Sequence, residues 1–190
     1  PVASESIVRE PETAKRMVDA AAALLETLSA GQRGKAVLSF DNVEERENWH
    51  YIPRDRMGLA LKEMDATQRG CVQQLLATGL SSDAHQRVNT IIELEPILAE
   101  LEGSGRKFER DPERYYVTLF GDIGGSEPWG WRFEGHHVSL NNTIVDGELI
   151  SASPLFFGAN PSEVRHGERE GLRALQQEED IGRALLVNLD

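Results

Sequence analysis

The sequence has little cysteine, few basic residues and no long apolar stretch, and each shortage excludes a class of protein. Cys71 is the single cysteine among 190 residues, so no disulfide can form within the chain. No apolar run approaches the roughly 20 residues that a membrane-spanning helix requires, and we expect no membrane span. Lysine and arginine number 20 against 32 aspartates and glutamates, giving a formal net charge of −12. Such a surface repels phosphate backbones, so we expect no nucleic-acid partner.

The short motifs of several large enzyme classes are also missing. The sequence contains neither a Gly-x-x-x-x-Gly-Lys-Ser/Thr loop nor Gly-x-Gly-x-x-Gly, so no nucleotide cofactor is indicated. It contains no Gly-x-Ser-x-Gly, so a Ser-His-Asp hydrolase would need residues brought together from distant segments. The hydrophobic fraction of 39% and the charged fraction of 27% are those of an ordinary folded domain with a core.

Helical periodicity dominates the first half of the chain. Residues 13–28 place apolar side chains at helical spacing and predict an amphipathic helix. Residues 65–78 predict a second helix, which a glycine ends. Ser81 or Ser82 should begin a third helix, and Pro96 should kink or divide it.

Two helix starts share one capping pattern. The stretch "LSAGQRGKAV" returns 36 residues later as "MDATQRGCVQ". Ser29 and Asp65 are good N-cap residues, and Gln32 and Gln68 lie three residues later, as in a capping box. The final stretch "EEDIGRALLVNLD" resembles "DAAAALLETLS", which ends at the N-cap residue Ser29. Asp190 therefore has the position of an N-cap residue, after which another helix would start. This is either a chance similarity between helix ends or the sign of a longer protein, and we expect the second.

The second half of the chain changes to strand patterns. "RYYVTLFGD" and "WGWRFEGHHVSLNNTIV" each predict one strand, and Asp146-Gly147 predicts a hairpin into "ELISAS". A last helix is expected from about residue 169 to residue 189. The order predicts an α+β fold with N-terminal helices, a small antiparallel sheet and a closing C-terminal helix. We expect a flexible arm over residues 1–12 and a single domain over residues 13–190.

The stretch from Trp129 to His137 gathers two tryptophans and two adjacent histidines. Alternate residues of a strand share a face, so Glu134 and His136 should project together, roughly 6–7 Å apart. Both could then ligate one zinc, iron or manganese ion, as in two-histidine, one-carboxylate sites. His50 is the preferred third ligand and His166 is an alternative, while His137 ranks third because it faces the other way.

The same residues also fit a core strand. Glu134 could pair with Arg132, and His136 could bond a neighbouring carbonyl group. Trp129 and Trp131 offer large, partly polar surfaces that suit a ligand pocket as well as a core. Buried arginine, glutamate and histidine are costly unless they satisfy one another, which favours a pocket.

Further candidates follow from charge and turn chemistry. Arg54 and Arg56 could bind a substrate carboxylate bidentately, although exposed arginines are also common surface residues. Asn160 precedes a proline and suits either a turn or a ligand contact. We predict catalytic roles for His137, as an acid–base group near neutral pH, and for Arg132, which would orient substrate anions.

Several blocks resemble the family catalogued as domain of unknown function 3500. They are "RDPERYYVTLFG", "PWGWRFEGHHVSLN", "FFGANPSEVRHGEREGLRAL" and "NWHYIPRDRMGL", and the resemblance runs from about residue 14 to residue 190. The family name implies no activity. The resemblance implies that the tryptophan-rich block is a family hallmark reaching Asn141, to which we give a ligand-binding role. It also implies longer proteins, in which further chain could complete the pocket, and favours export over a cytoplasmic location.

Three functions are compatible with these features. The first, which we favour, is a metal-assisted enzyme acting on a small polar or carboxylate-bearing molecule. The second is a non-catalytic module that binds a small ligand, a carbohydrate or a peptide. The third is a structural or interaction domain in which the polar strand residues satisfy one another. The sequence indicates no oligomeric state.

Overall fold

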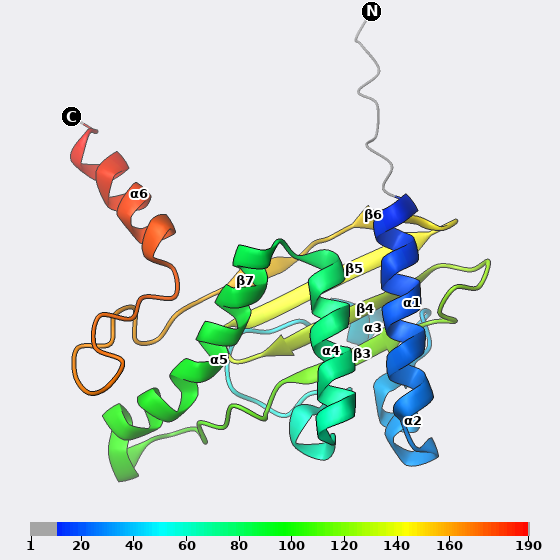
Figure 1. Ribbon diagram of the computed structural model, residues 1–190, viewed down its shortest axis with the longest axis horizontal. Coiled ribbons are helices and arrows are strands. Elements are labelled where there is room, and N and C mark those ends of the chain that lie inside the picture. Colours follow the sequence, from blue (N-terminus) through cyan, green and yellow to red (C-terminus); the bar gives the residue numbers. More distant parts are fainter. Residues whose placement is uncertain (1–10, 190) are drawn as a thin grey trace, which may run out of the picture.

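The computed structural model describes residues 11–189, in which helices cover one face of a mixed β-sheet (Figure 1). The helices are α1 (Pro11–Thr27), α2 (Ala30–Ala36), α3 (Val43–Glu47), α4 (Ala66–Gly79), α5 (Ser82–Glu102) and α6 (Gln176–Val187), with 3-10 turns at Leu61–Glu63 and Gly103–Gly105. The strands are β1 (Val37–Leu38), β2 (Leu59–Ala60), β3 (Tyr116–Phe120), β4 (Trp129–Gly135), β5 (Val138–Val145), β6 (Glu148–Ser151) and β7 (Leu155–Phe157). The predicted α+β class is confirmed.

The sheet is antiparallel except at one edge. Its order is β1-β3-β4-β5-β6, with β2 also pairing β3 and β7 also pairing β5. Only β1 runs parallel to its neighbour among the described strands. The predicted hairpin joins β5 to β6, because Asp146 and Gly147 both adopt positive φ, 52° and 73°, as a tight two-residue turn requires.

Residues 129–145 form two strands and not the single long strand that we predicted. The chain reverses at His136 and His137, and His137 carries a φ of 60°. Two histidines are not the Asn-Gly type of pair that announces a hairpin, so the alternation of side chains appeared continuous. Glycine is required just before the turn, because a Cβ on Gly135 would lie 2.3 Å from the Tyr115 ring. Glu134 therefore belongs to β4, whereas His136 belongs to the turn.

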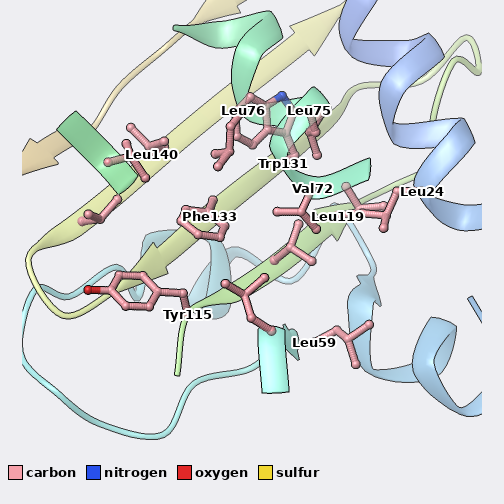
Figure 2. Packing of buried hydrophobic residues seen from close by; sticks show 14 of the residues in the cluster. Leu24, Leu59, Val72, Leu75, Leu76, Tyr115, Leu119, Trp131, Phe133 and Leu140 are labelled. Atoms are coloured by element: carbon pink, nitrogen blue, oxygen red, sulfur yellow. The ribbon is translucent and has the colours of Figure 1, made fainter. Parts of the chain in front are cut away.

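The core fills the space between the sheet and helices α1, α4 and α5. Trp131 of β4 lies beside Leu75 and Leu76 of α4, and Phe133 of the same strand belongs to the same core cluster (Figure 2). The Trp131 ring also packs against the end of α4, where a Cβ on Gly79 would lie 3.0 Å from it. The opposite face of the sheet is covered by residues 39–58, the covering segment, which includes α3 and runs behind the sheet in Figure 1.

Both predicted capping boxes form, and they are joined. Ser29 caps α2 and Asp65 caps α4, each with the glutamine at the third helical position. The Nε2 atoms of Gln32 and Gln68 donate to each other's Oε1 at 2.9 and 3.0 Å. Gln68 also donates to the carbonyl oxygen of Thr27 at 2.9 Å. Gln32 makes the equivalent bond to the carbonyl oxygen of Glu63, which lies 36 residues after Thr27. The repeat in the sequence is thus a local symmetry in the structure.

The C-terminal helix departs from the prediction. It starts at Gln176 rather than near residue 169, because Gly171 adopts a φ of 86° that an α-helix cannot include. No residue of α6 is buried, although Arg87 of α5 pairs with Glu178 in its first turn. The helix therefore does not close the core, and Figure 1 shows it standing apart from the sheet.

Three other predictions concern helix α5, the N-terminal arm and membrane-spanning helices. Ser81 caps α5, and this helix runs through Pro96 without being divided. Of the arm predicted over residues 1–12, residues 1–10 lie outside the described part and Pro11 already begins α1; Asp190 is also outside it. Within residues 11–189, the helices are too short or too polar to cross a membrane.

We predict that Gln68→Ala lowers the free energy of unfolding by about 1–3 kcal/mol. The buried Gln68 side chain serves the cap of α4, the Thr27 carbonyl and Gln32 together, so its loss leaves several groups unpaired. Urea unfolding measures the change, and Gln74→Ala on the exposed side of α4 is the control. The double variant with Gln32→Ala should lose less than the sum of the two single variants, and strict additivity would contradict the joined caps.

Candidate functional site

A buried ionic network lies between β4 and the covering segment. The Glu134 carboxylate oxygen Oε1 is 3.3 Å from the Nε atoms of both Arg56 and Arg132, and all three side chains are 1% exposed. Arg132 also pairs with the carboxylate of Glu45 and donates to the Glu45 carbonyl oxygen at 2.7 Å. Two cations thus meet two anions, which is how charges become tolerable away from water.

The network holds the covering segment on the sheet. The Arg56 guanidinium donates to the carbonyl oxygens of His50 at 2.8 Å, Ile52 at 2.7 Å and Gly135 at 3.1 Å. The backbone N–H of His50 donates to Glu134 at 3.2 Å. Burial raises the pKa of Glu134 and lowers that of Arg56, while the opposite charge beside each group counteracts the shift. Three predicted site residues are therefore bound in ion pairs with one another: Arg132, Glu134 and Arg56.

The predicted metal ligands do not meet at one point. The His136 Nδ1 atom bonds the Glu95 carboxylate of α5, and its carbonyl oxygen accepts a bond from the Tyr115 hydroxyl at 2.8 Å. The His50 Nδ1 atom accepts from two nearby backbone N–H groups. Among residues 11–189, no group of three or more His, Cys, Asp or Glu residues could hold a metal ion. The hairpin turn explains the separation, because it gives His136 partners on α5 and leaves Glu134 with the arginines.

His137 fixes the junction of three segments. Its N–H donates to the Tyr51 carbonyl oxygen at 2.9 Å, and its own carbonyl accepts from the Gly158 N–H at 2.8 Å. Its ring centroid lies 4.0 Å from that of His136, and its buried Nδ1 atom has no hydrogen-bond partner among residues 11–189. Burial, with smaller effects from His136 and Arg110, lowers the pKa of His137 to about 4. The imidazole is therefore neutral at neutral pH.

A cleft of about 270 Å³ opens on the same sheet face as the network. Its apolar wall consists of the aromatic residues Phe40, Trp49 and Phe120. Its polar wall consists of Arg46, Glu47, Asn141, Thr143 and Ser153. The cleft lies between the end of α3 and strands β3, β4 and β5. Its shape therefore depends on the position of the covering segment.

Arg46 is the cation of this cleft whose charge is not neutralised. Its guanidinium stacks 4.0 Å over the Phe40 ring and donates one bond, at 3.2 Å, to the Phe40 carbonyl oxygen. It has no ion-pair partner within residues 11–189, whereas Arg132 behind the cleft is balanced by Glu45 and Glu134. The aromatic ring orients the Arg46 group and leaves most of its donors available.

The structure places the other predicted residues as follows. Asn141 borders the cleft, where its amide nitrogen donates to Ser139 Oγ and to the Pro154 carbonyl oxygen while Oδ1 keeps its acceptor capacity. Trp131 borders the cleft too, but Trp129 and Trp131 are core residues, 2% and 1% exposed.

The remaining candidates do not reach the cleft. Arg54 donates to the Asn48 side chain at 3.0 Å, and Asn160 and His166 are exposed. Neither His137 nor Arg132 borders the cleft either.

Sequence reasoning missed Phe40, Arg46, Glu47 and Trp49. They lie in "FDNVEERENWH", which has no helical or strand periodicity long enough to predict a face. The signal that the sequence contains is a pair of aromatic residues, Phe40 and Trp49, on either side of a run of charged residues.

We predict that Glu134→Gln lowers the free energy of unfolding by about 3 kcal/mol. Its loss leaves the buried cations of Arg56 and Arg132 short of an anion, and an uncompensated buried charge is strongly destabilising. Chemical denaturation measures the loss. The exposed Glu44→Gln should be neutral by comparison, and an equally neutral Glu134→Gln would show that the network is not essential.

We predict that His137 makes stability depend on pH below neutrality. Its folded pKa of about 4 is below the unfolded value, so its contribution is complete above about pH 6.5 and is lost as the pH falls towards 4. His137→Asn, which tolerates the positive φ, should flatten this part of the profile in urea unfolding. The exposed His166→Asn should keep the wild-type profile. Equal slopes for wild type and His137→Asn would contradict the assignment.

The comparisons with known proteins give one match. The chain matches the family model described as "Protein of unknown function (DUF3500)" over residues 10–190, nearly its whole length. No curated protein and no solved structure matches it. The match confirms the resemblance carried by the tryptophan-rich block and its companion blocks. The chain belongs to the DUF3500 family of proteins of unknown function.

Proposed function

We propose that the protein binds a small carboxylate-bearing molecule in the cleft beside Arg46. The observation that carries this proposal is an un-neutralised guanidinium, stacked on an aromatic ring, at the edge of a cavity of about 270 Å³. A carboxylate is the natural partner of such a group, because guanidinium and carboxylate form paired, charge-assisted hydrogen bonds.

The cleft walls suit the rest of such a ligand. Phe40, Trp49 and Phe120 provide apolar surface, and Asn141 provides an acceptor. Ligand pockets likewise combine apolar walls with placed polar groups. The volume of about 270 Å³ is just below the usual range for ligand sites, which favours a small molecule.

The proposal concerns binding, without a catalytic step. The predicted catalytic residues His137 and Arg132 do not border the cleft. Metal-assisted catalysis with zinc, iron or manganese at Glu134, His136 and His50 stays a prediction. It would require the Glu134 carboxylate to exchange its two arginine partners for the metal ion, and His136 to bind through Nε2 because its Nδ1 bonds Glu95.

We predict that wild-type protein binds hydrocinnamate more tightly than hydrocinnamyl alcohol, which has the same ring and chain but no charge. Arg46→Gln should weaken hydrocinnamate binding by at least about tenfold and abolish the preference for the acid, because one charge-assisted pair is lost. Isothermal titration calorimetry measures both ligands.

The control for this experiment is Arg165→Gln, at an exposed arginine outside the cleft. It should bind both ligands as the wild type does. Equal binding of acid and alcohol by wild type, or acid binding that survives Arg46→Gln unchanged, would overturn the proposed function.

A further inference from the structure

The cleft carries a second charge that is not neutralised, and it has the opposite sign. Glu47 ends α3, next to Arg46, and its exposed side chain borders the cleft. Within the described residues, the Glu47 side chain has neither a hydrogen bond nor an ion pair. A ligand in this cleft therefore meets one available cation and one available anion.

The surrounding charges do not add to this pair. Arg132 lies behind the cleft, 5.4 Å from the centre of the Phe120 ring, but Glu45 and Glu134 balance its charge. The protein as a whole carries a formal charge of −12, which repels anions at long range and leaves a neutral molecule unaffected. Both the local and the global charge therefore favour a ligand that has one positive and one negative group.

The other walls restrict the shape of such a zwitterion. The rings of Phe40, Trp49 and Phe120 border the cleft and offer apolar surface to an apolar side chain. The Asn141 amide nitrogen is held by the Pro154 carbonyl oxygen at 2.8 Å, so its Oδ1 atom can accept from a ligand N–H group. With about 270 Å³ of space, both charges and the apolar group have to lie close together, as they do around a single carbon atom.

We propose that the ligand is a free α-amino acid with an aromatic or large aliphatic side chain. Its carboxylate pairs with Arg46, its ammonium group with Glu47 and Asn141, and its side chain packs against the three aromatic rings. This inference rests on the proposed carboxylate site and adds the ammonium group and the class of molecule to it.

Matched ligands separate the inference from the proposed function. L-phenylalanine differs from hydrocinnamate by the ammonium group, and L-leucine differs from isocaproate in the same way. Phenethylamine keeps the ammonium group and lacks the carboxylate. Calorimetric titration of wild type should give each amino acid at least about tenfold tighter binding than its matched acid or amine, the effect of one charge-assisted bond.

Variants assign the difference to one side chain. Glu47→Gln should reduce L-phenylalanine binding to the level of hydrocinnamate without weakening hydrocinnamate itself. Glu44→Gln, an exposed carboxylate on the same short helix, should change none of the affinities. A thermal unfolding curve equal to that of wild type shows that Glu47→Gln is folded.

Three results would overturn the inference. Hydrocinnamate binding as tightly as L-phenylalanine would refute the amino acid while leaving the Arg46 carboxylate site in place. An amino-acid preference that survives Glu47→Gln would refute the role of Glu47. If neither the acids nor the amino acids bind, the proposed function fails together with the inference.

Discussion

The carboxylate of Glu134, placed between the guanidinium groups of Arg56 and Arg132, is the interaction on which the rest of the functional face depends. Removing these charges from water is costly, and the cost is offset because each one has an opposite charge or a carbonyl group beside it. Through Arg56 the network holds the covering segment to the end of β4, and through Arg132 it holds α3 by Glu45. These contacts, together with the bond from the His137 N–H to the Tyr51 carbonyl oxygen, fix the covering segment over the sheet.

Local patterns predicted most of the fold because they depend on neighbouring residues. The apolar spacing of α1, the caps of α2 and α4 and the Asp146-Gly147 hairpin all have signals within a few residues. The reversal at His136 and His137 has no such signal, since the residue types do not announce a turn. The prediction therefore placed His136 on one strand with Glu134, whereas the structure places His136 in the turn, where its Nδ1 atom bonds Glu95 of α5.

The candidate site was less predictable because its contacts are long-range. Arg132 meets Glu45 from 87 residues away, and Arg56 meets the Gly135 carbonyl from 79. The sequence suggested that Glu134 and Arg132 could pair and that Asn141 could face a ligand, and the structure brings them to one region. It could not indicate Arg46 or Trp49, because a short helix flanked by irregular chain gives no periodic pattern. Membership of the family adds no chemistry to these residues.

The joined amides of Gln32 and Gln68 stand on either side of the covering segment in the chain. They close this segment into a loop, so much of the conformational entropy of ordering it is lost when the two helix starts meet. Because each amide bonds the other as well as nearby backbone groups, neither end can open alone without leaving polar groups unpaired. A stretch with little regular structure can in this way keep its place over the sheet, because a pair of neutral side chains joins the chain before it to the chain after it.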